Sequence, residues 1–474
     1  MAEFIGRATQ ISELDKMLSK VRADTSSKPG RALIMHGRRR VGKSRLAEEF
    51  LERSGGPGVF FAASKQTTQQ ELGHFAQAVL ESNIPGKEDF NGLSFGSWES
   101  ALKNLARILP GEQGTVIIID ELPYLIESDP AFEGTLQKIF DRELSSKKVL
   151  LILIGSDLAM MEALNDYGRP FHQRASEMSI PPLSPAEVAD MLKLNSADAL
   201  DAYLITGGLP LVCQEWVAGM SMSDFLRESF NSSTSALIVS GERSLAAEFP
   251  PTAQARDVLG AIGSGERTFT NIGRAAGGLT QTAINRGLVI LKDKRVVVGE
   301  SPLSATKSND TRYRIADTYL RFWLKFVAPN IQEIERGRGD RALERVGTAW
   351  GTWRGSAIEP VIRGSIERIP NPNVSGASPV VGSFWTRSNE PEIDLVVADR
   401  SPIANRVFEV GSIKWREQAS FDSRDMKDLV GQRLQLPGAD ASTPLLVVSR
   451  TGFSVPRTTN LRMLGPDDLI GAWR

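Results

Sequence analysis

The chain has 474 residues, a length that predicts about three domains, and a composition ordinary for a soluble globular protein. The formal net charge is −1, so no overall field directs the chain to nucleic acid or to a membrane. The single cysteine, Cys213, excludes a disulfide framework, fits a reducing cytosol, and with only three histidines argues against a zinc site. No apolar stretch reaches membrane-spanning length and the N-terminus lacks a signal-peptide pattern, so we expect a cytoplasmic protein without a membrane partner.

The first element expected is an amphipathic helix, because apolar residues recur at helical spacing between Ile11 and Leu18. The tetrapeptide Phe4-Ile5-Gly6-Arg7 precedes that helix. It resembles the "F-[VI]-G-R-x-x-E-L-x-x-L" start of AAA+ and STAND ATPases, in which this segment lies near the adenine. The resemblance implies that Gly6 and Arg7 lie near a bound nucleotide. A plain amphipathic helix behind a turn is the alternative.

A phosphate-binding loop is predicted between a buried strand at residues 32–35 and a helix that starts near Arg45. The loop reads Gly37-Arg38-Arg39-Arg40-Val41-Gly42-Lys43-Ser44 and matches G-x-x-x-x-G-K-[ST]. Its glycines let backbone N–H groups close around phosphates, and the helix N-terminus adds a partial positive charge. Lys43 would reach the β- and γ-phosphates, and Ser44 would ligate Mg²⁺. Residues 37–45 are therefore expected to hold ATP with Mg²⁺.

The second half of the nucleotide site is predicted at Asp120 and Glu121, which end a β-branched run, residues 115–119, suited to a strand buried on both faces. Open α/β sheets place ligands at the carboxyl ends of such strands. Asp120 would hold Mg²⁺ through water. Glu121 would orient and deprotonate the attacking water. A strand that merely ends in solvated acids is the alternative.

Three further residues are candidates for contact with the γ-phosphate. Residues 149–154 form another apolar strand pattern, which ends at Gly155-Ser156. In P-loop ATPases with a strand inserted between the loop and the acidic pair, a polar residue here senses the γ-phosphate, so the resemblance implies that role for Ser156. Arg169 and Arg174 could supply charge to the transferring phosphoryl group, from their own or a neighbouring subunit. A turn-forming Gly-Ser and solvated arginines are the alternatives.

A small helical region is expected from Ser184-Pro185-Ala186-Glu187, which has the residues of a helix start, to about residue 235. Within it, Gly207-Gly208-Leu209-Pro210 resembles the "G-G-x-P" element in the helical lid of STAND-type ATPases. That element faces the nucleotide, which implies a nucleotide contact for Pro210. A helix-breaking turn is the alternative.

A winged helix-turn-helix is predicted after a linker at residues 236–250, which ends at Phe249-Pro250-Pro251. Its three helices are expected at residues 253–262, 269–276 and 280–291, and its β-hairpin begins near Arg295. Residues 251–330 contain 12 Lys and Arg against 6 Asp and Glu, an excess that fits contact with DNA phosphates. The residues expected to contact double-stranded DNA are Arg286, Lys292, Lys294 and Arg295. A winged helix that docks a protein partner is the alternative.

The block from Tyr313 to Trp323 resembles the "Y-x-I-x-D-x-x-L-R-F-W" sequence of archaeal-type ATPases, which also occur in bacteria. In that family the block joins the winged helix to the C-terminal domain, and the resemblance extends over nearly the whole chain. Its apolar residues are expected on one helical face: Ile315, Tyr319, Phe322, Trp323 and Phe326.

The C-terminal region resembles the PD-(D/E)XK nuclease fold. After a charged connector at residues 331–350, a helix at residues 356–363 and strands at residues 392–398 and 406–415 are expected. The resemblance implies that the helix carries the acid Glu359, the first strand the metal-binding Asp394, and the second strand the lysine Lys414. In active members the carboxylates ligate Mg²⁺ and the lysine stabilises the reacting charge.

One position departs from that nuclease pattern, because Ser412 stands where a second metal-binding carboxylate is expected. Glu409 is near in sequence, but it would point to the opposite face of the strand unless Gly411 makes a bulge. We therefore expect a nuclease-like domain with little or no cleavage activity. A buried α/β core with stray charges is the alternative.

The predicted fold class is α/β, with a P-loop ATPase domain (1–183), a helical lid (184–240), a winged helix (245–330) and a nuclease-like domain (340–474). The expected reaction is Mg²⁺-dependent ATP hydrolysis coupled to DNA binding or remodelling. The alternatives are a STAND-like switch that acts through protein partners or self-association, and an ATP-gated nuclease.

Overall fold

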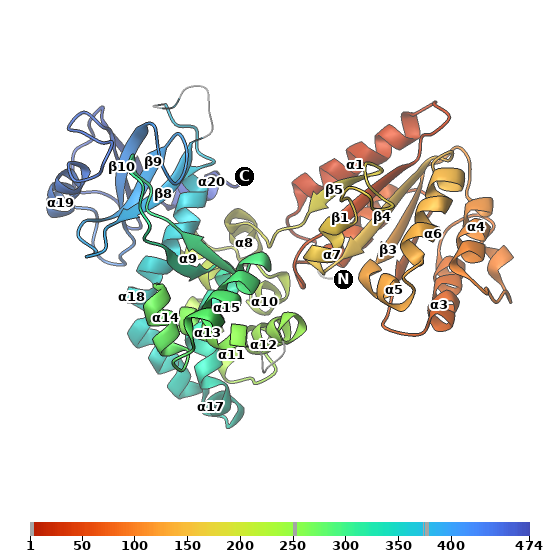
Figure 1. Ribbon diagram of the computed structural model, residues 1–474, viewed down its shortest axis with the longest axis horizontal. Coiled ribbons are helices and arrows are strands. Elements are labelled where there is room, and N and C mark those ends of the chain that lie inside the picture. Colours follow the sequence, from red (N-terminus) through yellow and green to blue (C-terminus); the bar gives the residue numbers. More distant parts are fainter. Residues whose placement is uncertain (1–3, 250–253, 373, 375–378) are drawn as a thin grey trace. The chain divides into compact units, whose positions relative to one another are not determined.

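The computed structural model describes residues 4–249, 254–372, 374 and 379–474. The chain forms two compact units, residues 1–182 and residues 183–474 (Figure 1). The predicted lid, residues 184–240, belongs to the second unit. None of the described helices combines the length and the apolar character needed to cross a bilayer.

Unit 1 is built on a parallel five-stranded sheet, which confirms the predicted fold class. Its strands are β1 (Arg31–His36), β2 (Gly58–Ala62), β3 (Thr115–Asp120), β4 (Val149–Gly155) and β5 (Ala175–Ser179). The spatial order is β2-β3-β4-β1-β5, so β4 is inserted between β1 and β3. The carboxyl ends of β1, β3 and β4 therefore meet at one edge of the sheet, where the phosphate loop, the acidic pair and Ser156 all follow.

Helices cover the sheet of unit 1, and its strands are apolar because both faces are buried. The helices are α1 (Ala8–Ala23), α2 (Lys43–Ser54), α3 (Thr68–Glu81), α4 (Trp98–Ile108), α5 (Leu122–Ser128), α6 (Phe132–Ile139) and α7 (Leu158–Ala163), with short helices at Lys87–Phe90 and Phe140–Leu144. On the face covered by α3, α4 and α6, Trp98 packs edge-on against Phe75 at 5.6 Å and against Phe132 at 5.0 Å between ring centroids. Such aromatic packing fixes the helices against the strands.

Unit 2 begins with helices, as predicted, and one predicted linker is itself a helix. The helices are α8 (Pro185–Leu192), α9 (Ser196–Thr206), α10 (Pro210–Glu215), α11 (Met222–Phe230) and α12 (Ala236–Glu248). The prediction of a linker at residues 236–250 was therefore wrong. A Cβ on Gly241 would lie 2.2 Å from the Trp323 side chain, so this glycine allows α12 to pack closely against Trp323. Pro250, Pro251 and Ala253 lie outside the described residues.

Three helices and a hairpin follow, near the predicted positions. They are α13 (Gln254–Ser264), α14 (Phe269–Ala275), α15 (Gln281–Asp293), and the antiparallel pair β6 (Val297–Glu300) and β7 (Arg312–Ile315). Ile315 ends β7 and does not belong to a helix, since α16 (Thr318–Phe322) starts only after Asp317 caps it. Ile315 is nevertheless buried together with the four aromatic residues that follow it in the predicted apolar set.

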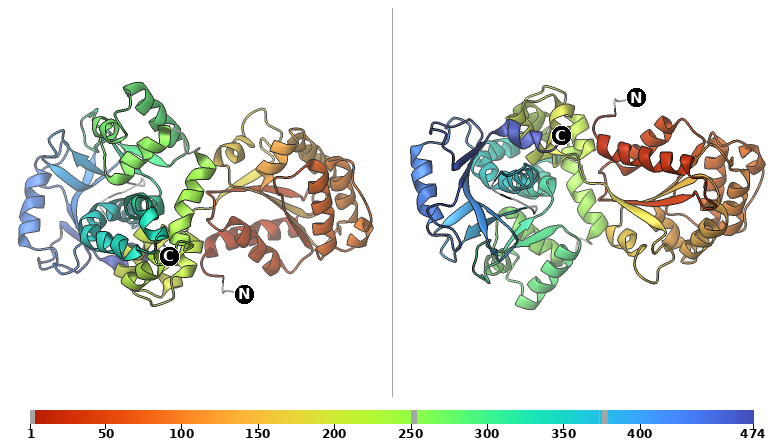
Figure 2. Two further views of the ribbon diagram at one scale, coloured as in Figure 1. Left: turned by 90° about the horizontal axis from the view of Figure 1, so that it is seen from below. Right: turned by 90° about the horizontal axis from the view of Figure 1, so that it is seen from above.

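The predicted connector at residues 331–350 is also helical. After turns at Trp323–Val327 and Ala328–Asn330, the chain forms α17 (Ile331–Glu335) and the long α18 (Gly339–Ile366). Gly339 starts α18 in a space where a Cβ would lie 2.0 Å from the Phe230 carbonyl oxygen, so this glycine too is required by packing. Figure 2 looks along α18, with the C-terminal sheet and the helices of residues 254–293 on different sides of it.

The C-terminal sheet has the order β12-β11-β10-β9-β8 and mixes antiparallel and parallel pairs. Its strands are β8 (Val380–Trp385), β9 (Glu392–Ala398), β10 (Val407–Lys414), β11 (Leu445–Ser449) and β12 (Leu461–Leu464), with helices α19 (Ser423–Arg433) and α20 (Pro466–Gly471). The first helical region of unit 2 is tied to this sheet by Asp201 of α9. Its carboxylate accepts hydrogen bonds from Arg354 of α18 at 2.9 Å and from the Trp415 indole at 2.9 Å.

Candidate functional site

The phosphate loop of unit 1 is shaped by two glycines. At Gly37 a Cβ would lie 2.4 Å from the Ile180 carbonyl oxygen, so a side chain there would push β1 away from the segment after β5. Gly42 caps α2 with a φ of 87°, a left-handed conformation that favours glycine. The backbone therefore turns sharply before α2 and leaves the helix N-terminus at the loop.

Lys43 lies inside that loop with only 5 % of its surface exposed. Its Nζ donates to the Gly37 and Arg38 carbonyl oxygens and to the Ser156 Oγ, each at 2.9 Å. Burial lowers the pKa of Lys43 to about 8, although the nearby carboxylates of Glu121 and Asp120 oppose this shift. The ammonium is thus held where phosphates would approach the loop, in surroundings that favour a negative partner.

The acidic pair lies at the end of β3 as predicted. Asp120 is buried, and its Oδ1 accepts a hydrogen bond from the Glu121 backbone N–H at 2.8 Å. Glu121 caps α5 with a φ of 53°, a conformation that costs energy for a residue with a side chain. The Ser156 Oγ donates to the Glu121 Oε1 at 3.2 Å. Ser156 therefore joins the loop lysine to the glutamate, a contact that the sequence did not reveal.

The Arg7 side chain supports the loop from outside. Arg7 is 3 % exposed, and its Nη2 donates to the Val41 carbonyl oxygen at 2.7 Å. The N-terminal motif is thus brought to the phosphate loop, and Gly6 precedes Arg7 with a φ of 81°. The first turn of α2 exposes Ser44, the predicted Mg²⁺ ligand, while the guanidinium of Arg45 pairs with Glu49 at 2.9 Å.

The two candidate arginine fingers are engaged in ion pairs within unit 1. Arg169 pairs with Glu133 at 2.6 Å, and Arg174 pairs with Asp141 at 3.0 Å. Either arginine would have to leave its carboxylate to reach a phosphoryl group. In unit 2, Pro210 is the first residue of α10. Two residues before it, a Cβ on Gly208 would lie 2.0 Å from the Leu183 carbonyl oxygen, so this glycine allows a close contact between the two backbone segments.

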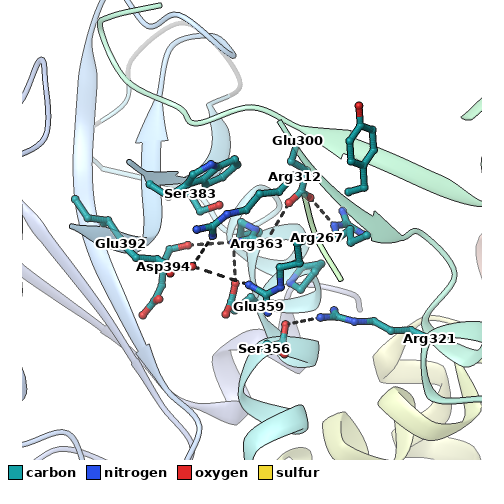
Figure 3. Close-up of a pocket in the computed structure, with 15 residues that line it drawn as sticks. Arg267, Glu300, Arg312, Arg321, Ser356, Glu359, Arg363, Ser383, Glu392 and Asp394 are labelled. Atoms are coloured by element: carbon teal, nitrogen blue, oxygen red, sulfur yellow. Dashed lines mark hydrogen bonds and ion pairs between the residues drawn. The ribbon is translucent and has the colours of Figure 1, made fainter. Parts of the chain in front are cut away.

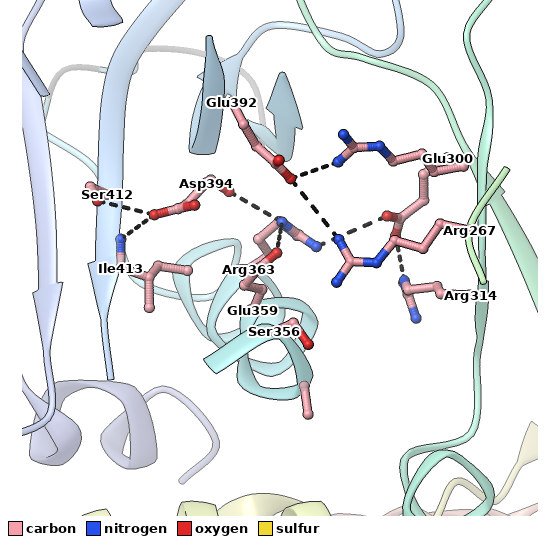
Figure 4. A network of polar contacts seen from close by, with 12 residues as sticks. Arg267, Glu300, Arg314, Ser356, Glu359, Arg363, Glu392, Asp394, Ser412 and Ile413 are labelled. Atoms are coloured by element: carbon pink, nitrogen blue, oxygen red, sulfur yellow. Dashed lines mark hydrogen bonds and ion pairs between the residues drawn. The ribbon is translucent and has the colours of Figure 1, made fainter. Parts of the chain in front are cut away.

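In the C-terminal region, Asp394 and Ser412 meet across β9 and β10 (Figure 4). Asp394 Oδ2 accepts a hydrogen bond from the Ser412 Oγ at 3.0 Å and one from the Ile413 backbone N–H at 2.8 Å. Glu359 of α18 faces the same region and pairs with Arg363 at 3.4 Å. Burial raises the pKa of Glu359 to about 7, and the charge of Asp394 adds to this shift against the pull of Arg363.

Glu409 does not join this group, as expected for a strand without a bulge at Gly411, so it does not stand in for the missing carboxylate. Its fully buried side chain pairs with Arg462 of β12 at 3.7 Å. The irregular step in β10 lies between Val407 and Glu409, so the strand is regular through Gly411 and alternation keeps Glu409 on the other face. Lys414 pairs instead with Asp425 of α19 at 3.9 Å. Across the described residues, no group of three or more His, Cys, Asp or Glu side chains is arranged to hold a metal.

The predicted DNA-contact residues lie on an exposed surface of α15 and the following turn. Arg286, Lys292, Lys294 and Arg295 are all exposed. The same helix also exposes two apolar side chains, Val289 at 56 % and Ile290 at 38 %. The surface is therefore both basic and apolar.

Two family models match the chain. Residues 4–214 match an ATPase domain predominantly from Archaea, and residues 323–428 match a domain of archaeal and bacterial proteins of unknown function. An uncharacterised protein of Methanocaldococcus jannaschii is 24 % identical over 413 residues, which cover 86 % of this chain and 88 % of that protein.

Solved structures with similarity include a Walker-type ATPase of Pyrococcus abyssi, with 18 % identity, a TM-score of 0.47, and coverage of 68 % of this chain and 96 % of that one. The ORC2 protein of Aeropyrum pernix, solved in ADPNP–ADP complexes, has 14 % identity, a TM-score of 0.48, and coverage of 71 % and 96 %. Residues 4–214, which contain the phosphate loop and the acidic pair, thus match the ATPase domain found predominantly in Archaea.

Proposed function

We propose that unit 1 binds ATP with Mg²⁺ and hydrolyses it. The observation that carries this proposal is the contact chain from the Lys43 ammonium through the Ser156 hydroxyl to the Glu121 carboxylate. A cation for the phosphates and a base for water are thus held side by side at the carboxyl edge of the sheet. The buried Lys43 and Asp120 and the exposed Ser44 hydroxyl form a donor set suited to a magnesium–phosphate ligand.

Each of these residues has a separate task in the proposed reaction. Lys43 would bind the β- and γ-phosphates, and Ser44 and Asp120 would hold Mg²⁺, which offsets negative charge on the phosphates when bound. Glu121 would accept a proton from the attacking water. Ser156, now shared between Lys43 and Glu121, would contact the γ-phosphate and link its presence to the base.

Equilibrium binding of a fluorescent ATP analogue to the full chain tests the first half of this proposal. Lys43→Ala should lose most of its affinity, because the phosphates lose their buried cation. Lys16→Ala, which alters an exposed lysine of α1, is the matched control and should bind like the parent protein. Equal binding by the two variants would reject the loop as the nucleotide site.

We further infer that nucleotide state is coupled to DNA binding through the basic surface of α15. Arg286, Lys292, Lys294 and Arg295 support this proposal, because exposed cations on one helix and its turn suit phosphate contact. Duplex DNA should then stimulate ATP turnover, and its binding should weaken as salt rises. Replacing Arg286 and Lys292 with alanine should reduce both effects.

The exposed Val289 and Ile290 favour a second candidate, a nucleotide-dependent switch that docks a protein partner or a second copy of this chain. Turnover indifferent to DNA, together with a change in molecular size on adding ATP, would support the switch. Turnover stimulated by DNA, with the size unchanged, would support the DNA-coupled ATPase.

A further inference from the structure

A pocket in unit 2 has the chemistry of an anion site, and neither Asp394 nor Lys414 lines it. Its volume is about 430 Å³, within the range of small-molecule sites. It lies between the end of α13, strand β7, helix α16 with the turn after it, and helix α18. Four cationic side chains line it: Arg267, Arg314, Arg321 and Lys325. Among the described residues that line this pocket there is no carboxylate.

The acidic side chains near this pocket line a smaller adjoining cavity of about 40 Å³, where they pair with arginines (Figure 3). It shares Arg267, Arg314 and Arg321 with the larger pocket. Glu300 there accepts a hydrogen bond from Arg314, and Glu392 pairs with Arg312 at 2.6 Å. The carboxylates of this region therefore line the smaller cavity and not the larger pocket.

Arg321 donates hydrogen bonds to the main chain rather than to a carboxylate. Its two Nη atoms donate only to main-chain carbonyl oxygens, to Ser356 at 3.1 Å and to Ala357 at 3.3 Å. Among the described residues no carboxylate lies within 4.0 Å of its guanidinium nitrogens. Burial lowers the pKa of Arg321 to about 10, and the like charges of Arg314 and Arg267 add to the shift, which the carboxylates of Glu359 and Glu300 oppose. A bound anion would relieve this repulsion.

Aromatic side chains also line the larger pocket. Trp353 of α18 lines it and is held in place by Phe322 and Phe326, whose ring centroids lie 5.8 Å and 5.2 Å away. Tyr313 of β7 adds a second ring. Arginine forks suit phosphate oxygens, and a fixed indole suits stacking by a planar ring.

We propose that this pocket binds a small nucleoside phosphate, with its phosphate at Arg267, Arg314 and Arg321 and its base against Trp353. The site is separate from the phosphate loop of unit 1 and does not depend on the ATPase assignment. A nucleoside phosphate fits better than inorganic phosphate alone, because the pocket has a volume of about 430 Å³ and is lined by aromatic side chains as well as by cations.

The test is calorimetric titration of the full-length Lys43→Ala variant with AMP, ADP, GMP, GDP and inorganic phosphate. At least one nucleotide should bind at one site per chain in this background. Arg267→Ala should weaken that binding about tenfold or more, because a charge-assisted contact to phosphate is lost. The Arg267 side chain is 45 % exposed and has only a distant pair with Glu392 at 4.0 Å, so this variant should fold.

Trp353→Leu should weaken nucleotide binding but leave any binding of inorganic phosphate unchanged. Arg341→Ala, an exposed arginine of α18 outside the pocket, is the matched control. The proposal is overturned if none of the nucleotides binds to the Lys43→Ala chain, or if the binding that remains is indifferent to Arg267→Ala. If Arg267 is needed for binding of duplex DNA and none of the nucleotides binds, the pocket is a nucleic-acid contact and the proposed nucleotide site is rejected.

Discussion

A single buried amine dominates the electrostatics of the phosphate loop. Lys43 is charged at neutral pH, yet three hydrogen bonds and two carboxylates only partly replace its lost hydration, so its pKa falls to about 8. The nucleotide-free protein therefore keeps a cation in place at a cost to its stability. This is the arrangement expected of a residue whose partner is a phosphate rather than another side chain.

The lowered pKa of Lys43 predicts how stability depends on pH without nucleotide. Between about pH 8, its folded pKa, and the unfolded value near 10.5, the unfolded chain binds the proton more strongly. The free energy of unfolding of unit 1 should therefore rise with pH in this window, by about 1 kcal/mol at pH 9. Chemical denaturation of the parent and of Lys43→Met at pH 7 and pH 9 measures the difference. A pH effect of equal size in both proteins would contradict the assignment.

Lys43 could be found from the sequence because the phosphate-loop pattern follows an apolar strand, and Asp120 and Glu121 because they stand at the end of another apolar strand. The partner of Glu409 could not be found in this way. Its contact with Arg462 crosses from β10 to β12 over the intervening β11, so it depends on the strand order. The Arg7 contact with Val41 likewise depends on tertiary packing that no local pattern encodes.

At the scale of elements, the insertion of β4 between β1 and β3 brings Ser156 beside both Lys43 and Glu121. Three loops distant in sequence thus share one edge of the sheet. The errors of the sequence analysis also belong to this scale. The predicted linker at residues 236–250 and the predicted connector at residues 331–350 are helical, and a glycine in each, Gly241 or Gly339, allows close packing against Trp323 or Phe230.

The contact between Asp394 of β9 and Ser412 of β10 predicts that the protein does not cleave DNA. Ser412 lies 3.0 Å from Asp394 and contributes a neutral hydroxyl where a second carboxylate would be needed for Mg²⁺. Plasmid and linear DNA should therefore stay uncut by the parent protein with Mg²⁺ or Mn²⁺. Ser412→Glu restores the charge and should permit cleavage, with Ser420→Glu, also in unit 2 but outside the sheet, as the control. Cleavage by the parent protein that is lost in Asp394→Asn would contradict this account.

At the scale of the whole molecule, the helices of residues 184–230 belong with the C-terminal sheet in unit 2. Asp201 of α9 holds Arg354 of α18 and the Trp415 indole, and Arg450 adds a contact at 3.2 Å. Asp201 and Arg354 are 5 % and 3 % exposed at their side chains, so neither charge is well solvated. A domain boundary at residue 240 would therefore separate Asp201 from Arg354 and Trp415, whereas the boundary after Pro182 keeps all three residues in one unit.

This buried ion pair predicts the stability of unit 2. Asp201→Ala should lower its free energy of unfolding by about 3 kcal/mol, because the buried Arg354 would lose its buried carboxylate and keep only Glu417, which is 56 % exposed. Asp198→Ala is the matched control, since that aspartate also pairs with Arg450 but is 52 % exposed, and it should cost about 1 kcal/mol or less. Urea unfolding followed by tryptophan fluorescence measures both. Similar losses in the two variants would show that the pair does not hold the region together.

Single-turnover hydrolysis of bound ATP by Glu121→Gln tests the proposed reaction most directly. The variant should still bind ATP, because Lys43 and the loop are intact, but phosphate release should slow by about 100-fold or more when the proton acceptor is lost. Glu127→Gln, an exposed glutamate of the same helix α5, is the control and should turn over ATP at the parent rate. Undiminished phosphate release by Glu121→Gln would contradict the account.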